Sequence, residues 1–421
     1  MTTAARSIAD PPPATAAGET RKRYRSGTHR LMTPAETLAR IRPLLPVMGI
    51  TRIAGIGGLD RLGIPVVMAC RPNSRSIAVA QGKGLDLDAA KASAVMEAVE
   101  TWHAETIEAP LRLASFEEMR LRHRLCDVSR LPMPADSRFD PDLRILWIEG
   151  EDLMHAAPAW LPYELVHTDY TLPPPAGSGC FVADTNGLAS GNHLAEAILH
   201  GLCELIERDA TALWMLSAPE AQARRCIAPD SIDDAGCRQV LRHLADADID
   251  VRIWETTTDV GVAAFLCVIA GRDPGEADPE FGAGCHPDRG VALLRALTEA
   301  AQARTTTIAG SRDDMGWDLY AAETRAERAA TCAALLRTTP QRPFGEAPDR
   351  AAETVAEDVD HVLSRLAAVD IDEVVAVDLS KPALRIPVVR VVVPGLEGAL
   401  HEDAAGAVPG ARARAVSGAG G

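Results

Sequence analysis

Three long segments with helical periodicity and repeated acidic side chains constrain the fold of this chain more than any other feature of its sequence. The expected helices cover residues 86–105, 192–214 and 290–308. Each of them spaces polar side chains three residues apart, as Glu97-x-x-Glu100, Glu204-x-x-Glu207 and Glu299-x-x-Gln302. Residues three and four apart share a helix face, so each helix should present one polar stripe and one apolar stripe.

Two interpretations of these polar stripes are open. An amphipathic helix with a solvated acidic face is the ordinary one. The second helix, however, has no Lys or Arg between Asn192 and Glu207, so its carboxylates repel one another unless cations neutralise them. Mg²⁺ prefers oxygen ligands and commonly bridges carboxylates to phosphate oxygens. A shared metal site between the three helices is therefore the functional hypothesis for these stripes.

Small residues stand next to all three helices. Gly82-Lys83-Gly84 precedes the first helix, where glycine lets backbone amides approach a phosphate and lysine neutralises its charge. A plain turn is the alternative, and the chain has no G-x-x-x-x-G-K-[ST] run of the P-loop type. Residues 185–191 lead into the second helix, and residues 309–314 follow the third, where Gly310 equally suits a helix C-cap.

The order of the remaining elements indicates a mixed architecture. Strands are expected at 53–68 (two, with a turn), 77–80, 251–270, 374–378 and 388–393, and a loop at 271–288. Strands and helices in this mixed order predict an α/β fold with α+β character. No linker composition interrupts residues 30–400, which should form one large domain between a disordered tail (1–29) and a flexible tail (401–421).

Charge and cysteine usage exclude several classes of protein. With 59 acidic and 43 basic residues the formal net charge is −16, so the chain has no overall attraction to nucleic acid or to an anionic membrane. The longest apolar stretch, near residues 260–270, is too short to span a bilayer. Nine scattered cysteines without a C-x-x-C pair argue against zinc and for reduced thiols in the cytoplasm. No catalytic nucleophile can be assigned.

Several strings of the sequence together resemble the YcaO family. They are RPNS (71–74), QGKG (81–84), ASAVMEAVE (92–100), TNGLASGNHLAEAILHGLCELIERDA (185–210), ALLRALTEAAQAR (292–304), AGSRDD (309–314) and VVVPGLEG (391–398). They follow the family's order over most of the chain, and the string at 185–210 is highly specific. GTHR, TPAETL and TWHAE near the start look like the subgroup that works with a TfuA-type partner.

This resemblance implies a single large domain that binds ATP with Mg²⁺ and activates a peptide backbone amide by phosphorylating its oxygen. A neighbouring Cys, Ser or Thr as nucleophile then gives an azoline, and external sulfide gives a thioamide. By this resemblance the metal ions would be bridged by six glutamates: Glu97, Glu100, Glu196, Glu204, Glu207 and Glu299. Lys83, Arg208 and Arg295 would neutralise phosphate. Ser93 and Asn192 would hydrogen-bond to the nucleotide, and Arg71 is expected near the same pocket.

Many azoline-forming relatives carry a proline-rich tail, whereas this sequence ends GARARAVSGAGG. That departure favours thioamide formation from an external sulfur donor, with a TfuA-like partner. The alternatives are azoline cyclodehydration of a ribosomal peptide precursor and a non-catalytic accessory protein that binds nucleotide or peptide. The family resemblance also allows a homodimer.

Overall fold

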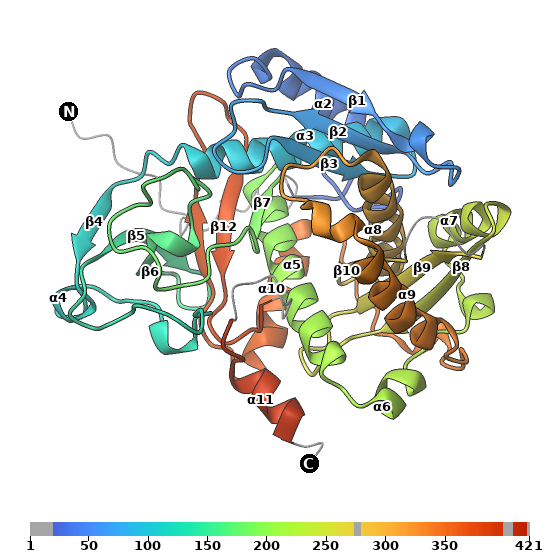
Figure 1. The fold of residues 1–421 in the computed structure, drawn as a ribbon. Helices are drawn as coiled ribbons and strands as arrows, with labels where there is room; N and C mark the ends of the chain where they lie inside the picture. Colours follow the sequence, from blue (N-terminus) through green and yellow to red (C-terminus); the bar gives the residue numbers. More distant parts are fainter. Residues whose placement is uncertain (1–19, 273–278, 399–406, 419–421) are drawn as a thin grey trace.

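Three antiparallel sheets surround a central helix in the computed structural model, which describes residues 20–272, 279–398 and 407–418 (Figure 1). The central helix is α5 (Leu194–Met215), and it corresponds to the second helix expected from the sequence. The other two expected helices are α3 (Leu87–Glu105) and α8 (Arg289–Ala309). The mixed α/β fold class predicted from the sequence is confirmed.

The first sheet consists of β1 (Arg52–Gly55), β2 (Val66–Cys70) and β3 (Val79–Lys83). α3 packs on this sheet, and α2 (Pro34–Ile41) packs on α3. β3 lies unusually close to α3, because Gly82 has no side chain. A Cβ atom at Gly82 would stand 2.0 Å from the backbone nitrogen of Ala94 and 2.3 Å from the carbonyl oxygen of Ala90. This close packing brings Lys83, the next residue, to the cavity described below.

The second sheet repeats this arrangement. It orders β10 (Glu280–Cys285), β9 (Ala264–Gly271) and β8 (Ile249–Glu255), with α7 (Ala235–Asp246), α8 and α9 (Ala322–Leu336) packed on it. α5 packs against its strands β9 and β10. The expected loop at 271–288 is wrong for its second half, because β10 pairs with β9 throughout. Its glycines indicated a loop. In the structure, Gly282 and Gly284 are the positions at which α8 packs directly against the strand.

The third sheet orders β4 (Leu111–Ala114), β5 (Ile145–Asp152), β11 (Val375–Asp378), β12 (Val388–Val392) and β7 (Leu188–Ser190), and β6 (Ala157–Pro162) pairs with β5. α5 packs on β12 and β7, and α10 (Val355–Ala367) packs on α5. The short helices α4 (Phe116–Arg120) and α6 (Pro219–Arg224) lie at the periphery (Figure 1). Where the structure describes the chain, no helix combines the length and apolarity that crossing a bilayer requires.

Side chains at the helix starts determine where the helices begin. Asp86 accepts a hydrogen bond from the backbone N–H of Ala89, and Asp288 accepts one from that of Val291. The cap of α5 is His193, whose side chain accepts from Ala195. The sequence had indicated that Asn192 lies on the helix. In the structure it stands in the turn ahead of α5.

Both chain ends are better ordered than expected, as far as they are described. Residues 20–29 were assigned to a disordered tail, but the buried Lys22 forms an ion pair with the buried Asp358 of α10. The expected flexible tail contains α11 (Ala411–Gly418), where Arg412 binds Asp209 of α5. Buried opposite charges hold these segments to the domain, and such long-range partners cannot be read from local composition. Residues 1–19, 401–406 and 419–421 lie outside the described part.

Candidate functional site

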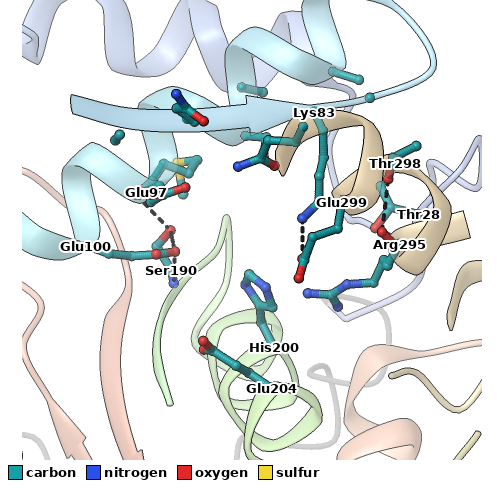
Figure 2. A pocket seen from close by; sticks show the side chains of 18 of the residues that line it. Thr28, Lys83, Glu97, Glu100, Ser190, His200, Glu204, Arg295, Thr298 and Glu299 are labelled. Carbon is teal, nitrogen blue, oxygen red and sulfur yellow. Dashed lines mark hydrogen bonds and ion pairs between the residues drawn. The ribbon is translucent and has the colours of Figure 1, made fainter. Parts of the chain in front are cut away.

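The predicted site residues converge on one cavity of about 720 Å³, which α3, α5, α8, β3 and the N-terminal segment enclose (Figure 2). All of them except Arg71 line it: Lys83, Ser93, Glu97, Glu100, Asn192, Glu196, Glu204, Glu207, Arg208, Arg295 and Glu299. The polar stripes of three helices thus face a shared interior. They are not solvated outer faces, so that alternative does not describe this fold.

One acidic group comes from α3. Glu100 accepts hydrogen bonds from the backbone N–H of Ser190 at 2.8 Å and from its hydroxyl at 2.7 Å (Figure 2). Burial raises the pKa of the Glu97 carboxyl to about 7 and that of Glu100 to about 8. Nearby positive charges, from Arg312 and Lys83 at Glu97, do not offset this burial, and a divalent cation would add the missing charge.

A second acidic group comes from α5. Burial raises the pKa of Glu204, and burial together with the nearby Glu299 raises that of Glu207 to about 7. The guanidinium of Arg208 lies 3.7 Å from Glu204 (Nη2 to Oε1). Arg208 and Arg295 lower both pKa values but do not offset burial, so α5 also presents carboxylates that would accept a metal ion.

Lys83 and Glu299 join the two sides of the cavity. Nζ of Lys83 donates to Oε2 of Glu299 at 2.5 Å. Burial by itself raises the pKa of the Glu299 carboxyl, but the Lys83 and Arg208 cations hold it below its usual value. Glu299 is therefore ionised at neutral pH, unlike the carboxyls that burial dominates. Lys83 and Arg295 stand beside it, in positions suited to a phosphate (Figure 2).

Glu196 binds the N-terminal segment. Its carboxylate accepts the backbone N–H of Leu31 at 2.5 Å on Oε1 and that of Asn192 at 2.7 Å on Oε2. The side-chain oxygen of Asn192 in turn accepts from the hydroxyl of Thr37 at 3.2 Å. Residues 26–37, which we call the strap, thereby form one wall of the cavity.

The sequence interpretation missed Arg30 and Arg312, and it took His200 no further than the polar stripe of α5. All three side chains line the cavity. Burial lowers the pKa of Arg30, and Glu196 opposes that shift. Burial, followed by the charges of Arg295 and Arg30, lowers the pKa of His200 far below its usual value, so its imidazole is neutral. Arg30 belongs to GTHR, a string that was noticed but attached to no chemistry.

Arg71 stands apart from the other predicted residues. It is buried behind α3, where it donates to Glu105 (Nη2 to Oε2, 2.5 Å) and to the hydroxyl of Thr101 at 2.8 Å. Its Nε also donates to the carbonyl of Met48 at 3.1 Å. These bonds fasten the loop after β2 to α3. Arg71 was expected near the nucleotide pocket as one of its binding residues. It lies behind Thr101, which lines the cavity, but does not line the cavity itself, so its nucleotide-binding role is corrected to this bracing position.

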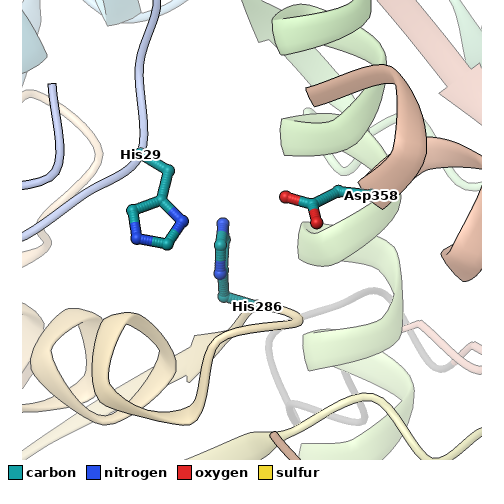
Figure 3. A group of neighbouring side chains, drawn as sticks. All are labelled: His29, His286 and Asp358. Atoms are coloured by element: carbon teal, nitrogen blue, oxygen red, sulfur yellow. The ribbon is translucent and has the colours of Figure 1, made fainter. Parts of the chain in front are cut away.

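A second cluster behind the strap brings ligand-type atoms of His29, His286 and Asp358 within 4.8 Å of one another (Figure 3). Asp358 already pairs with the buried ammonium of Lys22. Nδ1 of His286 accepts the backbone N–H of Asp288 at 2.9 Å, which leaves the proton of the neutral ring on Nε2. A metal ion would have to displace both that proton and the Lys22 cation, so this cluster fits a buried anchor of the chain start better than a metal centre.

An enzyme that uses a metal-bound nucleotide requires carboxylates that bind the divalent cations. It also requires Lys and Arg side chains nearby that bind the phosphates. The family model described as YcaO cyclodehydratase, ATP- and Mg²⁺-binding, matches residues 81–397. The chain belongs to the YcaO family, whose members include ATP-dependent enzymes, and the expected cofactors ATP and Mg²⁺ agree with the family description.

Relatives extend the match beyond the family model. A Rhizobium leguminosarum bv. trifolii protein named for the tfuA 3′ region is 42% identical over 379 residues, which cover 87% of this chain and 88% of that protein. A Methanothermobacter thermautotrophicus protein is 34% identical over 374 residues, covering 86% and 94%. Both matches begin before residue 81, where the family model starts, because they cover a larger share of the chain than lies between residue 81 and its end.

Solved structures share the fold. The structure of YcaO from Methanopyrus kandleri bound with AMPPCP and Mg²⁺ has a TM-score of 0.71 at 24% identity, with 90% of this chain and 95% of that one covered. A heterocyclase in complex with substrate and cofactor has a TM-score of 0.72 at 24% identity. The match covers 90% of this chain but only 54% of the heterocyclase, so that protein has further parts without counterpart here.

Proposed function

We propose that this protein binds ATP with Mg²⁺ in the cavity and uses it to convert a peptide backbone amide into a thioamide, with an external sulfur donor and a TfuA-like partner. The observation that carries the proposal is the convergence of buried carboxyls with raised pKa values, from separate helices, beside Lys83, Arg208 and Arg295. Nine free cysteines fit a reducing cytoplasm as the place of action.

The metal ions would be held by Glu97, Glu100, Glu196, Glu204, Glu207 and Glu299, and would neutralise phosphate charge there. Glu100 is oriented for this by its bonds to Ser190, and Glu196 by its bonds to two backbone amides. Lys83, Arg208 and Arg295 would bind phosphate oxygens, and Ser93 and Asn192 would hydrogen-bond to the nucleotide. The strap would exclude water from this side of the reaction.

The chemistry explains the need for ATP. Sulfide adds to the amide carbon and leaves an oxyanion, which attacks the γ-phosphorus of ATP and releases ADP. The C–O bond then breaks and phosphate leaves with the former amide oxygen and the electrons of that bond. The sulfur, which gives up its proton to solvent, forms the C=S bond, and the nitrogen keeps its hydrogen. The oxygen of an amide is a poor leaving group, and phosphorylation makes it a good one, so the protein's task is positioning and charge neutralisation.

The choice of sulfide as nucleophile rests on the relative from the tfuA 3′ region, whose gene neighbourhood matches the subgroup noted in the sequence. Azoline formation is the second candidate, favoured by the family description as a cyclodehydratase and by the fold shared with a heterocyclase. A non-catalytic accessory role is the third, and the retention of all six glutamates around the cavity counts against it.

Mass spectrometry separates these candidates. Purified protein is incubated with ATP, Mg²⁺, sulfide and candidate peptides, with and without the TfuA-like partner. Replacement of one oxygen by sulfur is the expected result, and it should require ATP. Loss of one water without sulfur uptake would instead establish azoline formation. ATP binding without any change in peptide mass, across peptides and partners, would favour the accessory role.

A further inference from the structure

The segment that joins α8 to α9 forms a rim of the cavity with an exposed aromatic side chain on it. Arg312, Asp314, Met315 and Leu319 of this segment line the cavity. Trp317, between them in sequence, is 91% exposed. The ring of a tryptophan so exposed beside a cavity offers a large apolar area for contact with a ligand.

Hydrogen bonds hold the rim (residues 312–320) in place from two sides. The Asp313 carboxylate accepts the backbone N–H of Ala78 at 3.1 Å, just before β3. The hydroxyl of Tyr320 donates to the carbonyl of Thr307 on α8 at 3.0 Å. Nε of Arg312 donates to Asp314 at 2.9 Å inside the segment. The rim is therefore attached to both walls that enclose the cavity, which makes it a fixed surface.

The cavity wall next to the rim differs in chemistry from the acidic half. Neutral side chains line it: Ile77, Val79, Gln81, Gln302, Thr306 and Thr307. The charged side chains here, Glu280 and Arg328, form an ion pair with each other at 3.0 Å. A wall of apolar and neutral hydrogen-bonding groups suits an uncharged peptide better than a polyphosphate.

Arg312 links this neutral half to the acidic half. Its guanidinium donates to Asp314 within the rim, and its side chain lines the same cavity as Glu97. The rim and the carboxyls proposed to hold metal ions thus line one cavity. A peptide lying along the rim would accordingly bring its backbone toward the phosphate-binding half.

We infer that the rim is where the peptide substrate binds, with the ring of Trp317 as its apolar anchor outside the cavity and Met315 and Leu319 as the contact surface leading inward. This inference deepens the proposed function and rests on it for the identity of the occupant, a peptide with apolar residues beside the modified amide. A partner protein that covers Trp317 in place of the peptide is the competing occupant.

Tryptophan fluorescence tests the rim without any need for turnover. Trp317 is 91% exposed, whereas Trp147, Trp160, Trp214 and Trp254 are buried and Trp102 is half-buried, so acrylamide should quench Trp317 selectively. The probes are capped octapeptides with Leu and Phe on both sides of a central Gly-Gly, and a matched set with Asp in those places. The apolar set at millimolar concentration should lower acrylamide quenching by about twofold, and the Asp set should not.

Unchanged quenching with the apolar peptides would overturn the inference. Protection of Trp317 by a TfuA-like partner, with no protection by the apolar peptides, would overturn it as well and would favour the partner as the occupant. The same assay on the Glu204→Gln protein should still show protection, because peptide binding at the rim does not use that carboxylate.

Kinetics separate failure of the rim from failure of the proposed function. With a peptide that changes mass in the assay above, Trp317→Ala should raise KM for peptide about tenfold and leave kcat within about twofold. Leu121→Ala, a matched control, changes a side chain that is 75% exposed just after the peripheral helix α4 and should leave both constants unchanged. An unaltered KM for Trp317→Ala alongside normal turnover would reject the rim and keep the function. Protection of Trp317 without any mass change would support the rim and reject the function.

Discussion

Nζ of Lys83 on β3 lies 2.5 Å from Oε2 of Glu299 on α8, which joins two elements more than two hundred residues apart in sequence across the cavity. Both side chains are partly accessible from the cavity, at 21% and 30%. An ion pair that a ligand can reach is available for exchange: the ammonium can turn to a phosphate while a metal ion takes its place at the carboxylate.

Replacing Lys83 by Met should move the acid limb of the pH–rate profile to higher pH and lower kcat/KM for ATP. Without the lysine charge the pKa of Glu299 rises, so ionised Glu299 is lost at a higher pH than in the wild type. The measurement is ATP-dependent peptide modification between pH 5.5 and 8.5. Lys91→Met is the matched control, because Lys91 on α3 pairs only loosely with Asp88, at 3.8 Å, and does not line the cavity. Coincident profiles for Lys83→Met and Lys91→Met would show that the ion pair does not set this limb.

Glu204→Gln should reduce ATP-dependent turnover by at least about a hundredfold, because an amide cannot supply the negative charge that a divalent cation requires. Gln has nearly the same shape as Glu, so the thermal midpoint should change little. Glu220→Gln, at an exposed position on α6, should retain full activity. Turnover of Glu204→Gln at the wild-type rate would exclude Glu204 from the metal site.

Stability should fall as pH rises from about 6.5 to about 8 when nucleotide and divalent cations are absent. The folded-state pKa values of Glu97 and Glu207 are about 7 and that of Glu100 about 8, above the ordinary value of about 4.3, so in this window the folded state holds more protons than the unfolded one. The protons leave as pH passes these values, and buried charge remains. Buried histidines do not mask this trend, because lowered pKa values such as that of His103, about 4, place their effect below this window.

Differential scanning fluorimetry across this pH window checks that prediction. Mg²⁺ with a non-hydrolysable ATP analogue should stabilise the protein and flatten the decline, since cations replace the protons. Glu100→Gln should melt at a higher temperature than the wild type at pH 8, because the amide still accepts from Ser190 but carries no charge. A wild-type midpoint that rises with pH would contradict the assigned direction of the shifts.

Gly82→Ala should destabilise the fold by about 3 kcal/mol, since the new methyl group would meet backbone atoms of α3 that cannot rotate away. Chemical denaturation measures the change. Gly58→Ala is the control, because nothing lies within 4 Å of a Cβ atom there, and its effect should stay within about 0.5 kcal/mol. Equal stability of the two variants would mean that β3 and α3 can separate without cost.

Local periodicity was enough to predict the three long helices, and their observed ends differ from the expected ones by two residues or fewer. It was not enough for β10, because the glycines of that strand are disfavoured in strands until a helix packs against them. The same limit applies to the chain ends, where Lys22 and Arg412 find carboxylates far away in sequence.

The sequence by itself determined which helix faces are acidic, because side-chain spacing along a helix follows from 3.6 residues per turn. It could not determine that Arg71 points away from the cavity to Glu105, or that Arg30, Arg312 and Trp317 gather around it. Those positions depend on how sheets and helices pack at long range, and packing is decided by contacts between residues that no local pattern connects.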